Sequence, residues 1–202
     1  MLTIALPKGR IAEQTLEKFA KAFNEEFIFE DRKLILKKSG FTFLNVRNQD
    51  VPTYVMHGAA DLGVVGLDVL EEKEYDLVKL LDLKLGQCKL AIGLRAGEEL
   101  DWTKSEIKVA TKHEKIAKRY FEQKAMAVEI IKLYGSIELA PLVGLSDCIV
   151  DIVETGLTMK QNGLEVGPTI MQSSVHLIAN KNAFYAKKDQ ILDIRERIEA
   201  TL

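Results

Sequence analysis

Two hydroxyl and two carboxylate side chains surround a glycine in one short segment, IVDIVETGLT, which spans residues 149–158. Its apolar residues predict a strand over 149–153, followed by a helix that begins at Thr155 or Thr158 and stops at Gly163. Hydroxyls and backbone N–H groups at a helix start can bind phosphate, and Asp151 at the strand's carboxyl end can accept hydrogen bonds from sugar hydroxyls. A plain cap beside a solvated carboxylate fits equally well, so the segment alone leaves both interpretations open. The loop consists of Glu154, Thr155, Gly156, Leu157 and Thr158.

The segment PKGR provides a second candidate anion site. Lys8 and Arg10 flank Gly9 at the point where a short apolar strand gives way to a helical pattern. Free N–H groups at a helix start attract anions, two cations strengthen that attraction, and a glycine lets the backbone approach a phosphate closely. These residues predict a phosphate or pyrophosphate site, although two solvated charges in an exposed loop also fit.

A third strand-to-helix junction, KLYGSIELAP, is a weaker candidate. It holds Lys132, Ser136 and Glu138. We expect Ser136 to cap the helix that follows, and a serine cap is equally good with or without a ligand. The cap therefore decides nothing about function.

Two arginines lie beside apolar strand residues, Arg32 in EDRKL and Arg47 in NVRNQDVPTY. An arginine in this position is often held in a structural ion pair, for which Asp31 or Asp50 could serve. Asp50 is also expected to cap a helix that has Pro52 in its first turn. The residues alone therefore favour a structural role for both arginines.

The elements that must position these residues alternate between strands and helices. Strands are predicted at 2–6, 33–38, 41–47, 61–66, 89–95, 107–112, 128–135, 149–153, 164–171 and 174–181. Helices are predicted at 11–23, 50–58, 67–75, 113–124, 137–144 and 187–202, besides the one that stops at Gly163. This alternation is typical of an α/β protein with largely parallel sheets.

Composition excludes several classes of function. The 202 residues are 47% hydrophobic and 29% charged with a net charge of −2, which argues against a nucleic-acid-binding surface. No apolar stretch is long enough to span a membrane and no signal peptide is evident, so we expect a cytoplasmic protein. Cys88 and Cys148 form no metal-type pair and are expected to be free thiols.

Common catalytic motifs are also missing. There is no H-E-x-x-H, G-x-S-x-G or Walker-type phosphate loop, and GVVGLD lacks the third glycine of a dinucleotide fingerprint. His57, His113 and His176 are widely separated and do not suggest a site. We expect no set of protein metal ligands.

The segment ELAPLVGLSDCIVDIVETGLT, residues 138–158, resembles the signature of ATP phosphoribosyltransferase, the first enzyme of histidine biosynthesis. LPKGRI, DVPTYVMHGAADLGVVGLDVL, LLDLKLGQCKL, VATKH and IKLYGSIELAP also look like family segments, and they stand in family order. Because the chain ends at Leu202 without the histidine-binding domain of the long form, it resembles the short-form catalytic subunit. The resemblance implies a regulatory partner similar to histidyl-tRNA synthetase, and a homodimer within a larger hetero-oligomer.

By the same resemblance, the fold is expected to be like a two-lobed periplasmic binding protein with a central cleft. Lobe I would hold residues 1–90 and 173–202, and lobe II residues 91–172, with no C-terminal regulatory domain. The implied reaction transfers phosphoribosyl from phosphoribosyl pyrophosphate (PRPP) to N1 of ATP, so the enzyme is a pentosyltransferase. Mg²⁺ would arrive with PRPP and be bound mainly by substrate oxygens.

The resemblance also implies roles for individual residues. The loop from Glu154 to Thr158 would bind the 5′-phosphate of PRPP, and Asp151 its ribose hydroxyls. Arg10 would stabilise the pyrophosphate leaving group and Arg32 is a second active-site arginine. Further phosphate or cleft-wall residues would be Lys8, Gly9, Lys132, Ser136 and Glu138. A two-lobed anion sensor without enzymatic activity, or a phosphoribosyltransferase for another base, is the alternative.

Overall fold

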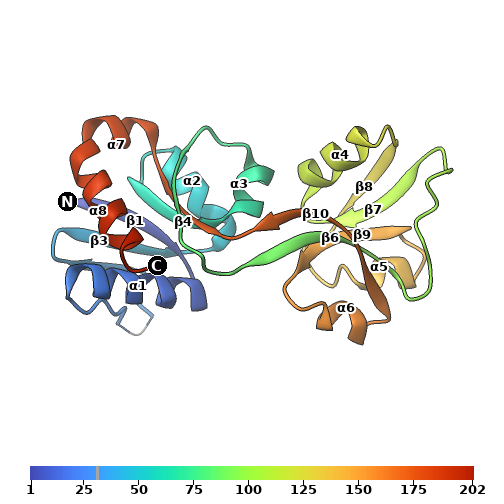
Figure 1. Ribbon diagram of the computed structural model, residues 1–202, viewed down its shortest axis with the longest axis horizontal. Coiled ribbons are helices and arrows are strands. Elements are labelled where there is room, and N and C mark those ends of the chain that lie inside the picture. Colours follow the sequence, from blue (N-terminus) through green and yellow to red (C-terminus); the bar gives the residue numbers. More distant parts are fainter. Residues whose placement is uncertain (31) are drawn as a thin grey trace. The chain divides into compact units, whose positions relative to one another are not determined.

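The structure is a computed structural model that describes residues 1–30 and 32–202. It divides into two compact units: unit 1 comprises Met1–Gly86 and Ser174–Leu202, and unit 2 comprises Gln87–Ser173. Both ends of the chain belong to unit 1 (Figure 1). The first crossing lies a few residues before the expected boundary at residue 90, because the strand that begins at Cys88 pairs entirely within unit 2.

Unit 1 contains a six-stranded sheet in the order β2-β3-β1-β4-β11-β5. Its strands are β1 (Leu2–Pro7), β2 (Ile35–Lys38), β3 (Phe41–Val46), β4 (Leu62–Gly66), β5 (Val78–Asp82) and β11 (Val175–Ala179). Its helices are α1 (Arg10–Phe23), the 3₁₀ turn η1 (Asn48–Asp50), α2 (Val51–Met56), α3 (Leu67–Lys73), α7 (Lys181–Ala186) and α8 (Lys188–Glu199). The sequence did not predict β5 or α7.

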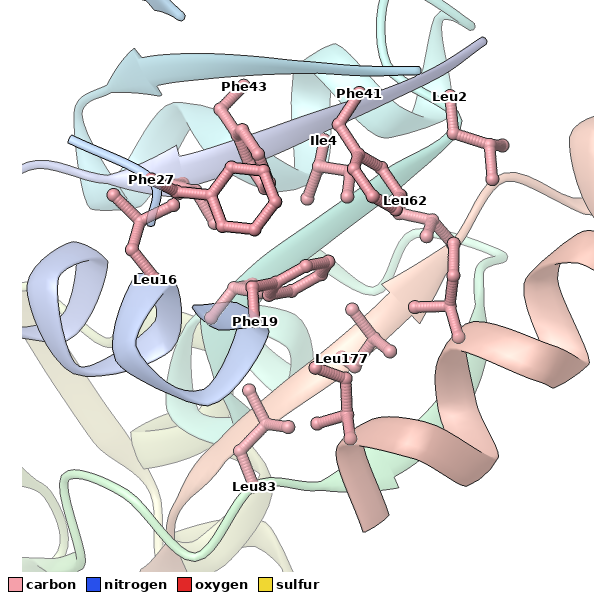
Figure 2. Packing of buried hydrophobic residues seen from close by; sticks show 14 of the residues in the cluster. Leu2, Ile4, Leu16, Phe19, Phe27, Phe41, Phe43, Leu62, Leu83 and Leu177 are labelled. Carbon is pink, nitrogen blue, oxygen red and sulfur yellow. The ribbon is translucent and has the colours of Figure 1, made fainter. Parts of the chain in front are cut away.

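A cluster of phenylalanine rings fills the space between α1 and the sheet of unit 1 (Figure 2). Phe19 of α1 is 1% exposed, and its ring meets Phe41 and Phe43 of β3 edge-on at centroid distances of 5.7 and 5.2 Å. Phe27, from the segment after α1, packs against Phe43 at 5.3 Å. Edge-to-face pairs add stabilisation beyond the area that they bury, so this cluster fixes α1 against β3.

Unit 2 contains a five-stranded sheet in the order β10-β6-β9-β7-β8. Its elements are β6 (Cys88–Arg95), β7 (Ile107–Thr111), α4 (Glu114–Gln123), β8 (Val128–Lys132), α5 (Leu139–Leu142), β9 (Cys148–Val153), α6 (Leu157–Gln161) and β10 (Leu164–Ser173). One core cluster joins Leu90, Val109, Phe121 and Val150, all fully buried. Each sheet therefore has its own hydrophobic core.

Both sheets are mixed, and the expectation of largely parallel sheets is wrong. β1 runs parallel to β3 and β4, and β7 runs parallel to β8 and β9. β11 is antiparallel to β4 and β5, β6 is antiparallel to β9 and β10, and β2 is antiparallel to β3. The strands that carry the chain between the units account for most of the antiparallel pairs.

Candidate active site

The carboxyl ends of three parallel strands meet along one edge of the sheet in unit 2. β7 lies between β8 and β9, and Thr111 at its end stands opposite both Lys132 and Val150. The residues that follow these positions, Lys112 after β7 and Asp151 on β9, therefore lie at the same edge. Ligands of open α/β sheets usually bind at such an edge.

The loop from Glu154 to Thr158 lies just beyond β9 and forms a small pocket. Gly156 has a φ of 78° and precedes α6, which begins at Leu157 rather than at either threonine. The hydroxyl of Thr155 accepts a hydrogen bond from the backbone N–H of Leu157, at 3.4 Å. The pocket has a volume of about 240 Å³ and is lined by Glu138, Ile152, Val153, Glu154, Thr155, Gly156, Leu157, Thr158 and Met159. Two hydroxyls and a tight turn in one pocket suit a phosphate group.

One hydrogen bond and one ion pair hold Asp151 near the end of β9. Its Oδ1 accepts a hydrogen bond from the backbone N–H of Ile152, at 2.8 Å. The Nζ of Lys112 lies 3.3 Å from the same oxygen. Sequence reasoning did not select Lys112, although its place after the strand IKVAT was a usable signal because lysines there face a potential anion site.

Of the three candidates in the junction KLYGSIELAP, only Glu138 lines the pocket of the loop from Glu154 to Thr158. Lys132 forms an ion pair with Glu114 and lies 5.7 Å from the ring centroid of Tyr134. Ser136 does not cap α5: its φ is 50°, and its carbonyl accepts the N–H of Leu139 at 3.2 Å. A left-handed residue three positions before the helix cannot present its hydroxyl as an N-cap, so the prediction of a serine cap is wrong.

Lys8, Gly9 and Arg10 lie at the corresponding edge of unit 1. β1 ends at Pro7, opposite Val46 of β3, and the N–H of Lys8 donates to the carbonyl of Val46 at 2.8 Å. Gly9 has a φ of 94° and forms the N-terminal boundary of α1. The two cations therefore flank the start of a fourteen-residue helix, where anions are favoured.

A larger pocket of about 500 Å³ lies along α1 and also touches Gly9. Its other lining residues are apolar or acidic, apart from one asparagine: Ala12, Glu13, Leu16, Glu17, Ala20, Glu26, Phe27, Ile28, Phe29 and Asn45. Carboxylates repel phosphate, so this pocket is a poor anion site despite its size.

Arg32 and Arg47, the two arginines for which structural ion pairs were expected, lie in different surroundings. Arg32 is exposed with a φ of 54°, and its expected partner Asp31 lies outside the described residues. Arg47 follows β3, and its carbonyl accepts the N–H of Asp50 at 2.9 Å. Asp50 precedes α2, with Pro52 in the first turn as predicted, but its side chain makes no capping hydrogen bond.

Three general properties bear on the chemistry. Within residues 1–30 and 32–202, no cluster of three or more His, Cys, Asp or Glu side chains is arranged to hold a metal ion. Over the same residues, no helix is both long and apolar enough to cross a membrane. Cys88 and Cys148 are free thiols, and burial raises the pKa of Cys148 to about 12.

The fold and these two strand edges define an α/β protein of the two-unit kind seen in solute-binding proteins. The periplasmic aliphatic sulphonate binding protein SsuA from Escherichia coli superimposes with a TM-score of 0.63 at 14% identity, covering 98% of this chain and 70% of that chain. This likeness confirms the expected fold class.

The family is narrower. The model of the HisG family, ATP phosphoribosyltransferase, matches residues 47–200. ATP phosphoribosyltransferases from Sulfurovum sp. and Helicobacter hepaticus are 68% and 56% identical over 202 residues, which is 100% of this chain and 98% of each relative. The structure of the ATP phosphoribosyl transferase HisG:HisZ complex from Thermotoga maritima matches with a TM-score of 0.87 at 35% identity, covering 99% of this chain and 98% of that chain. The chain therefore belongs to the HisG family of ATP phosphoribosyltransferases.

Proposed function

We propose that the protein transfers the phosphoribosyl group of PRPP to N1 of ATP, giving N1-(5-phospho-D-ribosyl)-ATP and pyrophosphate, the first step of histidine biosynthesis. The observation that carries the proposal is the pocket formed by the loop from Glu154 to Thr158, with Asp151 at the end of the preceding strand. Hydroxyls in that pocket suit the 5′-phosphate of PRPP, and the carboxylate suits the ribose hydroxyls. Family membership supports this assignment.

The reaction needs charge stabilisation more than proton transfer. N1 of adenine already has a lone pair, so the difficult steps are the departure of pyrophosphate and the positive charge that develops on the ribose. Arg10, with Lys8 beside it at the start of α1, is proposed to stabilise the leaving pyrophosphate. Arg32 is proposed as a second cation for the phosphates, and Lys132, Ser136 and Glu138 as neighbouring residues of the site.

Mg²⁺ is proposed to enter with PRPP. Because the described residues offer no three-ligand cluster, the ion would rely mainly on substrate oxygens, as Mg²⁺ does in many phosphate-transfer sites. It would neutralise part of the diphosphate charge. The chain's own contribution is then to hold the phosphate and ribose ends of PRPP.

We further propose that the chain is the short-form catalytic subunit. The Thermotoga maritima structure is a HisG:HisZ complex in which this chain matches 98% of the aligned chain. A HisZ-like regulatory subunit, similar to histidyl-tRNA synthetase, is therefore the proposed partner of a homodimer. We also propose that the protein acts in the cytoplasm, because ATP and PRPP are its proposed substrates.

The direct test is incubation with ATP, PRPP and Mg²⁺, with and without a HisZ-type subunit, while ultraviolet absorbance follows N1-phosphoribosyl-ATP. Arg10→Ala should slow the chemical step by roughly one to three orders of magnitude and weaken PRPP binding less. Arg197→Ala is a matched control, because Arg197 pairs with Asp193 on α8 at 2.9 Å. An Arg10→Ala variant with an unchanged single-turnover rate would remove Arg10 from the mechanism.

The same assay distinguishes the two other candidate functions. PRPP binding with no product, in the presence of every base and of the partner, would indicate an anion sensor. Product with a base other than the adenine of ATP would indicate a different phosphoribosyltransferase. Each unit has one candidate anion site at a strand edge. Two such sites favour an enzyme that handles two phosphate groups over a sensor, which needs only one anion site.

A further inference from the structure

We propose that Lys112 is a positioning residue for PRPP, which acts by holding the carboxylate of Asp151. The inference rests on the proposed function, because it takes Asp151 as the ligand of the ribose hydroxyls. The Nζ of Lys112 lies 3.3 Å from Oδ1 of Asp151, and the N–H of Ile152 donates to that same oxygen at 2.8 Å. A hydrogen bond and an ion pair on the same oxygen fix the carboxylate and leave its other oxygen, Oδ2, to accept from the substrate.

The backbone that carries Lys112 is itself fixed by a buried hydroxyl. Thr111 is 0% exposed, and its Oγ1 donates to the carbonyl of Val150 at 2.6 Å. The same Oγ1 accepts the N–H of His113 at 2.9 Å. Thr111 therefore ties the end of β7 to β9 on one side and to the start of α4 on the other. Lys112 lies between these two anchors, so its side chain begins from a fixed point near Asp151.

Two lysines stand at this edge of the sheet, and their partners differ. Lys132, at the end of β8, forms an ion pair with Glu114, in the first turn of α4. The side chain of Lys112 is 33% exposed and that of Asp151 is 17% exposed, so their ion pair is partly shielded from solvent. Shielding strengthens a charge pair relative to one in bulk water.

The charge of Lys112 has a second effect on the same carboxylate. PRPP carries several negative charges, and an isolated carboxylate beside its ribose would repel them. A cation on Oδ1 of Asp151 offsets this repulsion while leaving the carboxylate able to accept hydrogen bonds. Lys112 thus both aims Asp151 and makes its charge compatible with a polyanionic substrate.

The experiment measures PRPP binding by calorimetry and initial rates for PRPP and ATP. Lys112→Met should raise the dissociation constant and KM of PRPP by roughly ten- to a hundredfold, because a misplaced substrate contact costs that much, and should leave the KM of ATP unchanged. Lys112→Arg should recover most of the loss, since it restores the cation. A residue that only stabilised the fold would not separate the two substrates in this way.

A double-mutant cycle with Asp151→Asn tests whether Lys112 acts through Asp151. The effect of Lys112→Met should largely disappear when Asp151 is already Asn, because coupled residues are not additive. Lys104→Met is the matched control: Lys104 pairs with Asp147, just before β9, at 2.7 Å. Its PRPP affinity should equal that of the wild type.

Each outcome has one meaning. Additive losses, or an unchanged PRPP affinity in a folded Lys112→Met variant, would overturn the role of Lys112 while leaving the proposed function intact. A wild type that binds PRPP but forms no N1-phosphoribosyl-ATP would overturn the proposed function, and the binding cycle would still decide the role of Lys112. A wild type that does not bind PRPP would overturn both.

Discussion

Replacing Gly156 by alanine tests the proposed phosphate loop most directly. Gly156 has a φ of 78°, a conformation that costs a residue with a Cβ about 1–2 kcal/mol. The added Cβ would also lie 3.1 Å from Cγ2 of Val166, so the loop or that side chain must move by a few tenths of an ångström. We expect unfolding at a temperature about 2–8 °C lower, given ~2–4 °C per kcal/mol for a chain of this size.

The same substitution should weaken PRPP binding, because the displaced loop carries Thr155 and Thr158. A misalignment that costs ~1.4 kcal/mol lowers affinity about tenfold. Gly163→Ala is the matched control: Gly163 has a φ of 72°, yet a Cβ there meets no atom within 4 Å. Gly163 follows α6 and does not line the loop pocket.

The assay combines thermal unfolding with calorimetric titration of PRPP and Mg²⁺ for both variants. Both should lose a similar amount of stability from the backbone strain, whereas only Gly156→Ala should lose PRPP affinity. Equal PRPP affinities in the two variants would refute the argument that this loop binds the 5′-phosphate. Unchanged stability in both would refute the strain estimate.

Two further predictions concern stability. Phe19→Ala should lower the unfolding free energy of unit 1 by about 3–5 kcal/mol in urea titrations, because it empties the centre of the phenylalanine cluster; a loss under about 1 kcal/mol would contradict that packing. Burial raises the pKa of Asp147. Hydrogen bonds from Lys104 and from the N–H of Lys108 lower it by more, so the pKa of Asp147 lies below its ordinary value. Its contribution is therefore present above the unfolded pKa and lost as pH falls through the lowered folded pKa, and Asp147→Asn should flatten the decline in stability below about pH 4.

Local patterns predicted much of the fold because they depend on neighbouring residues. Phe19 and Phe23 belong to an apolar four-residue spacing that predicted α1, which spans Arg10–Phe23. The segment DLGVVG at 61–66, apolar after its first residue, predicted β4, whose first four residues are buried. The alternation of strands and helices predicted an α/β protein, and the family resemblance supplied the two-lobed fold, which alternation alone did not.

Features that depend on distant partners were missed. β5 has one exposed and four partly buried residues and so shows no alternating pattern, and its pairing partner β11 comes nearly a hundred residues later. The antiparallel direction of β11 and β6 likewise depends on how the chain returns between units. A local pattern carries no information about such pairings.

The candidate site shows the same division. The loop from Glu154 to Thr158 is contiguous in sequence, so its residue types alone raised the phosphate hypothesis. Lys112 meets Asp151 only because β7 and β9 are neighbours in the sheet. Ser136 was predicted as a helix cap from its residue type, but its own left-handed backbone conformation, three residues before α5, prevents this.

The position of β11 has a consequence for synthesis on the ribosome. β11 lies inside the sheet of unit 1, between β4 and β5, yet it follows the whole of unit 2 in sequence. Residues 87–173 can therefore fold as soon as they emerge, because all the strands of their sheet lie within this one uninterrupted stretch of the chain. The first 86 residues must wait with an open gap beside β4 until the final segment arrives. Vectorial synthesis thus completes the inserted unit first and the unit that begins the chain last.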